Sequence, residues 1–226
     1  MPNTPVHPSQ CGLPETIWLA SRSPRRKALL ETLGLTVQVY LAQGSAEAEA
    51  LEAPQAGEAP LPYVERVTRL KLQTALQAMQ AEGLSGIVLA ADTTVALHHT
   101  ILGKPESPQQ AELMLKQLSN TIHHVHTAVA VAKLGRNGAL ADVALAVQSS
   151  QVGFTHLPDS FIQAYIASGE PFDKAGAYGI QGIAGQYVSH ISGSHSGIMG
   201  LPLFETGQLL RHIQSAAQSS TPKQSI

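Results

Sequence analysis

The sequence predicts an α/β protein built on a mixed β-sheet. Strand-like and helix-like patterns alternate along most of the chain, which is typical of a sheet covered by helices. Hairpins interrupt this alternation, because turn-forming segments at residues 98–100 and 135–138 each separate two strand patterns. Both kinds of connection in one chain indicate a mixed sheet, and no internal repeat is present.

The composition is that of an ordinary globular protein. The 226 residues are 43% hydrophobic and 13% charged, with a formal net charge of −2, and they suffice for one large domain or two small lobes. A negative net charge argues against a stable nucleic-acid partner. The single cysteine, Cys11, cannot form an internal disulfide, which fits a reducing compartment.

No targeting or membrane signal is visible. No apolar run reaches the roughly 18–20 residues that span a bilayer. Residues 1–14 lack the basic start and the apolar stretch of a signal peptide. We therefore expect a cytoplasmic protein without a membrane partner.

The first predicted elements are a flexible tail, a short strand and a helix. Residues 1–15 are rich in proline and polar side chains, which is typical of a flexible tail. Residues 17–20 have a buried-strand pattern. The helix that follows begins with Ser23 as its N-cap and Pro24 at its first position, where a missing N–H has no cost. Alternation over residues 36–41 predicts a second strand.

A mobile surface loop is expected over residues 43–60, which hold few large apolar side chains. Near-helical spacing of apolar residues then predicts a long helix over 62–82, followed by a glycine as a stop. A buried-strand pattern covers residues 87–91 and runs into residues 92–97. A serine–proline pair, as cap and first position, starts another helix over 107–118.

Two strands and a helix follow in the second half of the chain. The strands are predicted over 125–134 and 141–154, and the helix over 158–167. Residues 176–185 hold four glycines, a density expected where backbone approaches a ligand closely.

The chain is predicted to end on a helix and a polar tail. The helix begins near Leu203 and fades after Ile213, so residues 214–226 are expected to be flexible. The remaining residues, 16–213, are predicted to form a single domain.

Two arginines at the start of the first helix point to an anion. Arg25 and Arg26 lie in the first helical turn, where positive side chains oppose the helix dipole, so helix stability does not explain them. Backbone N–H groups at a helix start and guanidinium groups both suit phosphate. We interpret the segment as a polyphosphate cradle, with a solvated basic turn as the alternative.

Asp92 is the leading candidate for catalysis. A carboxylate at the end of an apolar strand is costly unless a cation, a metal or hydrogen bonds meet it. Such carboxylates ligate metals or activate water, and a capping aspartate is the alternative. Lys71 on the long helix and Lys104 before a proline add positive charge. Together these residues predict a polyphosphate–metal site.

The histidines do not predict a zinc site. Strand alternation places His124 and His126 on one face and His123 on the other, and no cysteine or acid stands at ligand spacing.

In the glycine-rich segment, Gln181 offers a donor and an acceptor suited to reading the edge of a base.

A set of motifs, in this order, resembles one known family. They are LASRSPRRKALL, VLAADTTV, LGKPESPQQAELMLKQLS, HTAVAV, SGEPFDKAGAYGIQG and GLPLFET. The chain is similar, from about residue 17 to residue 210, to the Maf family of nucleoside triphosphate pyrophosphatases, also called septum-formation-inhibitor proteins. The resemblance implies a Maf/inosine-triphosphatase-like fold, in which a mixed twisted sheet is flanked by helices and two lobes surround a central cleft.

The resemblance also implies an activity, hydrolysis of a nucleoside triphosphate to the monophosphate and pyrophosphate with a divalent cation, Mg²⁺ or Mn²⁺. Asp92 matches the proton acceptor that activates water. The residues matching the triphosphate-binding set are Ser21, Arg25, Arg26, Lys71 and Lys104. The positions associated with base selection are Arg25, Thr93 and Gln181. The DKAGAYGIQG segment is similar to the subgroup that acts on dTTP and UTP, and a homodimer is implied.

Two features depart from the family pattern. Arg22 stands where the family usually has a small or neutral residue. The family's acidic pair after the second strand is shifted or absent, with Glu47 and Glu49 as the nearest substitutes, so Asp92 and Glu47 are the candidate metal ligands.

The expected role is removal of unwanted or modified nucleotides before polymerases use them, with a link to cell-division arrest. Two alternatives stay open. One is a pyrophosphatase for 7-methyl-GTP or another modified nucleotide. The other is a nucleotide-binding regulator of division with little turnover.

Overall fold

The computed structural model describes residues 7–42 and 53–219. Within these residues the chain forms a seven-stranded sheet in the order β2-β1-β3-β5-β6-β7, with β4 paired to β3 off this path. Strand β1 pairs in parallel with β2 and β3, and the other pairs are antiparallel. The predicted α/β class with a mixed sheet is confirmed.

The strands are β1 (Thr16–Leu19), β2 (Thr36–Val39), β3 (Gly86–Leu97), β4 (Thr100–Leu102), β5 (Ile122–Leu134), β6 (Leu140–Phe154) and β7 (Val188–Ser192). The α-helices are α1 (Pro24–Glu31), α3 (Pro60–Ala81), α4 (Pro108–Leu118), α5 (Asp159–Ala167), α6 (His195–Met199) and α7 (Leu203–Ser219). Short 3₁₀ turns are η1 (Pro8–Cys11), η2 (Glu170–Asp173), η3 (Ala175–Ala177) and η4 (Ile183–Tyr187). None of the described helices is long and apolar enough to cross a membrane.

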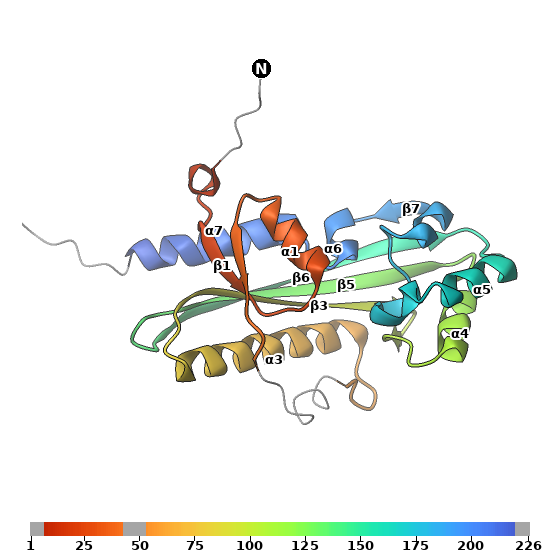
Figure 1. The fold of residues 1–226 in the computed structure, drawn as a ribbon, viewed down its shortest axis with the longest axis horizontal. Coiled ribbons are helices and arrows are strands. Elements are labelled where there is room, and N and C mark those ends of the chain that lie inside the picture. Colours follow the sequence, from red (N-terminus) through yellow and green to blue (C-terminus); the bar gives the residue numbers. More distant parts are fainter. Residues whose placement is uncertain (1–6, 43–52, 220–226) are drawn as a thin grey trace, which may run out of the picture.

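Helices cover both faces of the sheet. Helix α3 lies along one face, while α1 and α7 lie on the other (Figure 1). Strand β3 is therefore buried on both sides. Its residues Val88 and Ala90 pack in the cluster of α3, and Leu89 and Ala91 pack in the cluster that includes β1, α1 and α7. This double burial explains why the strand is a continuous apolar run rather than an alternating one.

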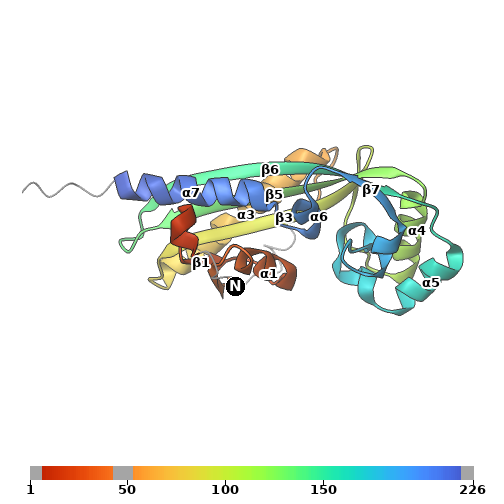
Figure 2. The same cartoon turned by 90° about the horizontal axis from the view of Figure 1, so that it is seen from above.

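A second lobe forms at the far end of the sheet. Helices α4 and α5 gather there, away from β1 and α1 (Figure 2). Their core cluster includes Val95 of β3, Val125 of β5 and Val152 of β6. The two lobes thus share the central strands. The central cleft that the resemblance implies between them stays a prediction.

The helix caps form as predicted. Ser23 Oγ accepts a hydrogen bond from Arg26 N at 3.4 Å, and Ser107 Oγ accepts one from Gln110 N at 3.2 Å. Proline occupies the first position after each cap, where its rigid φ suits the helix.

Some boundaries differ from prediction. The long helix begins at Pro60 rather than residue 62, and β5 begins at Ile122 rather than residue 125. Of the predicted loop, residues 43–52 lie outside the described part, and 53–59 contain no helix or strand.

The predicted N-terminal tail contributes to the core, and part of the predicted C-terminal tail is helical. Leu13 is buried in the same core cluster as Leu210 and Ile213, and η1 precedes it. Helix α7 does not fade after Ile213 but continues to Ser219. The buried residues Leu210 and Ile213 of this helix pack on the sheet. Tertiary packing of this kind stabilises a helix beyond the point where its own sequence favours it.

Candidate active site

The turn between β1 and α1 is fixed by two serines. Ser21 Oγ accepts a hydrogen bond from Ser23 N at 3.2 Å, and Ser23 caps the helix. The backbone N–H groups at the start of α1 and the side chains of Arg25 and Arg26 therefore emerge from one defined turn at the carboxyl end of β1. This is where α/β sheets commonly bind anions.

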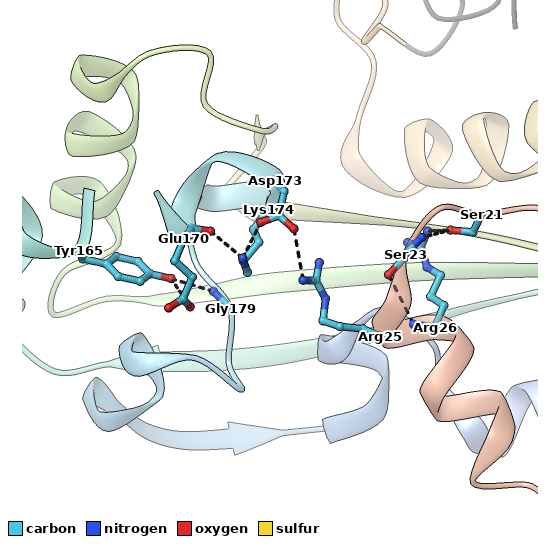
Figure 3. A network of polar contacts seen from close by, with 9 residues as sticks. All are labelled: Ser21, Ser23, Arg25, Arg26, Tyr165, Glu170, Asp173, Lys174 and Gly179. Atoms are coloured by element: carbon cyan, nitrogen blue, oxygen red, sulfur yellow. Dashed lines mark hydrogen bonds and ion pairs between the residues drawn. The ribbon is translucent and has the colours of Figure 1, made fainter. Parts of the chain in front are cut away.

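Arg26 joins three separate parts of the fold. Its Nε donates to Gly200 O at 2.8 Å, and its two terminal nitrogens donate to Ser21 Oγ at 3.1 Å and Thr93 Oγ1 at 3.2 Å. The guanidinium therefore holds the β1–α1 turn against β3 and against the segment after α6 (Figure 3 shows its contact with Ser21). This geometry is not that of a solvated basic turn.

A threonine pair extends the contacts of Arg26 into the core. Thr93 Oγ1 lies 3.0 Å from Thr127 Oγ1, and the buried Thr127 donates to Gly197 O at 2.8 Å. The position of Thr93, a predicted base-selecting residue, is thus set by β5 and α6. Thr127 was not singled out from the sequence, although it lies in the predicted strand and inside the HTAVAV motif.

Asp92 meets the positive charge that the sequence argument requires. Lys71 Nζ on α3 lies 2.7 Å from Asp92 Oδ1, with the two side chains only 25% and 15% exposed. The carboxylate does not end its strand, because β3 continues to Leu97 as one arm of a hairpin. The strand-end position was therefore wrong, and with it the capping alternative.

Asp92 and Thr93 lie on opposite faces of β3. Strand alternation places Asp92 on the face of α3 and Thr93 on the face of α1, in agreement with their contacts to Lys71 and Arg26. Consecutive residues of one strand thus carry the two halves of the predicted site. A ligand can reach both halves only from the edge of the strand.

No described strand pairs with this edge of β3 between Leu89 and Val95. Strand β1 pairs with β3 at Val88 and Leu89, β4 pairs with it from Val95, and no other described strand covers the residues between on this side. Leu89 O accepts from Ala20 N, so the backbone groups of alternate residues, Ala91 and Thr93, face the same gap. Of these two residues, Thr93 is partly exposed and Ala91 is fully buried.

Arg25 makes a contact between the lobes. Its guanidinium lies 3.5 Å from Asp173 Oδ2 of η2, and Asp173 also pairs with Lys174 (Figure 3). Burial opposes ionisation of Asp173, but the hydrogen bond and charge of Lys174, helped by Arg25, hold the pKa of this carboxyl below its usual value. A phosphate bound by Arg25 would compete with Asp173 for the guanidinium. The Arg25–Asp173 pair was not predicted from the sequence, although Asp173 is the first residue of the DKAGAYGIQG segment.

Two predicted residues lie apart from this centre. Lys104 is exposed after β4, and Gln181 is exposed on the turn that Gly182 N closes onto Gly179 O at 3.0 Å. Both belong to the second lobe, where Gly176 N donates to Gly103 O at 3.0 Å and brings the two segments together. The segments that carry Lys104 and Gln181 are thus joined through the backbone, and no contact between either side chain and Asp92 is observed among the described residues.

The histidines follow the predicted alternation. His124 and His126 stack with ring centroids 5.7 Å apart, and His126 Nδ1 lies 2.8 Å from Ser149 Oγ. His123 lies on the other face, fully buried beside Tyr178.

The donor set is compatible with a divalent cation carried by the substrate. Asp92 is the one predicted metal ligand that the described residues contain, since Glu47 lies outside them. Within the described residues no group of three His, Cys, Asp or Glu side chains could hold a metal. Mg²⁺ usually binds through one or two carboxylates together with substrate phosphates, and a single carboxylate beside a cationic cradle fits that pattern.

A surface depression of about 490 Å³ is not part of this arrangement. It is lined by residues 54, 55 and 57–59 before α3 and by His99 and Ile101 of the β3–β4 hairpin. None of the predicted site residues lines it, so we do not assign it to the site.

Comparison with known proteins shows which family this chain is similar to. The family model described as Maf-like protein matches residues 16–213. A dTTP/UTP pyrophosphatase of Albidiferax ferrireducens is 50% identical over 198 residues, which are 87% of this chain and 96% of that protein. One of Ralstonia nicotianae is 51% identical over 86% of this chain and 92% of its own length. A solved nucleoside-triphosphatase, dITP/XTP pyrophosphatase, of Mycobacterium abscessus aligns with a TM-score of 0.42 and 15% identity over 92% of this chain and 98% of that chain.

Proposed function

This chain belongs to the Maf-like protein family, and we propose that it is a pyrophosphatase that hydrolyses dTTP and UTP to the monophosphate and pyrophosphate. Two relatives at about half identity, aligned over nearly their full length, carry that activity in their names. The chain is accordingly a hydrolase. Its role is to remove unwanted or modified nucleotides before polymerases use them, and a link to division arrest would follow from altered nucleotide pools.

The Lys71–Asp92 pair, where no described strand pairs with the edge of β3, is the observation that carries the proposal. Lys71 fixes the carboxylate by a 2.7 Å contact, and across the same strand Arg26 and Thr93 line the other face. Asp92 takes the proton of a water that attacks the phosphorus nearest the sugar. The bond from that phosphorus to its bridging oxygen breaks, and pyrophosphate leaves with the electron pair.

The cationic groups of the site bind the triphosphate. Arg26 and Ser21 hold phosphate oxygens at the β1–α1 turn, Arg25 exchanges Asp173 for phosphate, and Lys104 approaches from the second lobe. These contacts offset the charge of the leaving pyrophosphate, which is the main electrostatic demand of the reaction. Base selection falls to Arg25, Thr93 and Gln181.

A divalent cation, Mg²⁺ or Mn²⁺, belongs to this proposal. Asp92 would hold it together with the phosphates of the substrate, and Glu47 is the second candidate ligand. When bound, the cation neutralises phosphate charge that the lysines and arginines do not reach.

Release of pyrophosphate from a panel of nucleotides tests the function. With Mg²⁺ we expect turnover of dTTP and UTP well above that of CTP and 7-methyl-GTP, and we expect EDTA to abolish it and added Mg²⁺ or Mn²⁺ to restore it. Preference for 7-methyl-GTP would move the chain to the modified-purine alternative. Tight dTTP binding without any product would instead favour the regulator of division, and full activity in EDTA would remove the cation from the proposal.

Family membership further supports a homodimer in the cytoplasm. Light scattering during size-exclusion chromatography is expected to give about twice the 23.8 kDa mass of the chain. A mass of one chain at micromolar concentration would contradict the dimer and leave the catalytic proposal unaffected.

A further inference from the structure

A phenol in the second lobe is engaged by the glycine-rich segment. Tyr165 of α5 is 2% exposed, and its hydroxyl donates to Glu170 Oε1 at 3.0 Å while it accepts from Gly179 N at 3.3 Å (Figure 3). Burial raises the pKa of the phenol well above its usual value; the hydrogen bond from Gly179 N–H opposes this shift and the carboxylate of Glu170 adds to it, so the phenol keeps its proton. The hydroxyl thus links Glu170 to one backbone N–H of the turn.

The turn itself lies directly against Glu170. A Cβ atom on Gly182 would overlap the Glu170 carboxylate, and one on Gly179 would lie 2.8 Å from Lys174 Cε. Gly182 N donates to Gly179 O at 3.0 Å, which closes the turn and places Gln181 inside it. The turn therefore packs directly against the carboxylate of Glu170.

The start of the turn is held from the opposite side. Tyr178 Oη and His123 Nε2 of β5 share a hydrogen bond of 2.7 Å inside the core. Burial, helped by the neighbouring His124, lowers the pKa of His123 to about 4, so the ring is neutral near pH 7. The backbone before Gly179 is thus fixed to the shared sheet, and the residue left exposed on the turn is Gln181.

The segment that holds the turn also contacts a residue of the proposed phosphate-binding set. Lys174 Nζ donates to Glu170 O at 2.6 Å, and its neighbour Asp173 contacts Arg25 of α1. One short segment therefore connects the turn that carries Gln181 with an arginine of the triphosphate cradle.

We propose that Tyr165 and Glu170 are positioning residues that fix the Gly179–Gly182 turn so that Gln181 can select the base of the nucleotide. The inference rests on the proposed function and deepens it, because neither residue belongs to the set proposed to bind the triphosphate. Loss of the Tyr165 hydroxyl removes the acceptor of the partly buried Gly179 N–H and the donor to Glu170 Oε1, and the turn then samples other conformations. Base selectivity falls, while binding of the triphosphate portion does not.

Substitutions at these two residues, assayed on paired substrates, test the inference. In Tyr165→Phe and Glu170→Ala we expect the ratio of kcat/KM for dTTP to that for CTP to fall about tenfold. The inhibition constant of inorganic pyrophosphate, which reports the cradle without a base, is expected to stay within about twofold. Glu170→Gln keeps an acceptor for the phenol and is expected to retain the selectivity ratio. Tyr187→Phe removes another phenol hydroxyl from the same lobe and serves as the matched control.

Hydrogen exchange gives a second readout that needs no turnover. Because Gly179 N–H donates to Tyr165, the peptide covering residues 178–182 is expected to exchange faster in Tyr165→Phe than in the wild type, and at the wild-type rate in Tyr187→Phe. If wild-type protein hydrolyses no nucleotide, the proposed function fails and exchange alone decides whether Tyr165 positions the turn. Unchanged exchange, or unchanged selectivity in a folded and active variant, overturns the inference.

Discussion

Replacing Asp92 with asparagine is expected to lower kcat for dTTP roughly a thousandfold, the usual contribution of a general base. The amide keeps the shape of the carboxylate but cannot accept a proton at neutral pH. Arg26 contacts both Ser21 and Thr93 on the opposite face of β3, so the cradle for the triphosphate stays in place. The loss should therefore appear in kcat far more than in KM.

The substitution also removes the Lys71–Asp92 ion pair. Both side chains are largely buried, so thermal unfolding is expected to occur at a lower temperature than in the wild type. Pyrophosphate release, dTTP binding by calorimetry and a thermal scan separate these effects. Asp142→Asn is the matched control, because its carboxylate pairs with His212 at an exposed site between β6 and α7. Wild-type turnover by Asp92→Asn would remove Asp92 from the catalytic role.

Replacing Arg26 with lysine is expected to lower kcat/KM for dTTP about a hundredfold and to destabilise the fold. The guanidinium donates to Gly200, Ser21 and Thr93 at the same time, and a lysine ammonium cannot match that planar fork. Hydrogen bonds to charged groups contribute about 1.5–3 kcal/mol each, so losing more than one accounts for an effect of this size.

The readouts for this change are steady-state kinetics and the unfolding temperature of the purified variant. Arg69→Lys provides the comparison, because Arg69 makes an exposed pair with Glu65 on α3, and such pairs contribute little. A kcat/KM within twofold of the wild type in Arg26→Lys would show that the cradle does not depend on the guanidinium. A change in stability without a change in kinetics would assign Arg26 a structural role alone.

Local signals predicted most of the fold correctly. Ser23 and Ser107, each followed by proline, are local capping patterns, and they form the expected caps because such hydrogen bonds span only three residues. The hairpins and the strand alternation of the histidines were likewise readable from neighbouring residues. The failures came where packing overrode local composition, as in α7, which extends to Ser219.

The candidate site was predicted as a set of residues but not as an arrangement. Lys71 and Asp92 were both chosen from the sequence, yet their pairing required α3 to lie along one face of β3. Arg25 was expected at phosphate, and its contact with Asp173 appears only when the two lobes face each other. Asp92 was placed at a strand end because an apolar run stops there, whereas the strand continues through polar threonines.

By itself, the sequence determined the α/β class, the capped helices and the residue types that suit a triphosphate, because these depend on residues close together in the chain. Only the tertiary structure decided that Asp92 and Thr93 serve opposite faces of one strand and that Arg26 reaches a residue 67 positions away. It also decided that Tyr165 supports the turn of Gln181. Such contacts follow from sheet register and helix packing, which the whole chain fixes together when it buries its apolar surface.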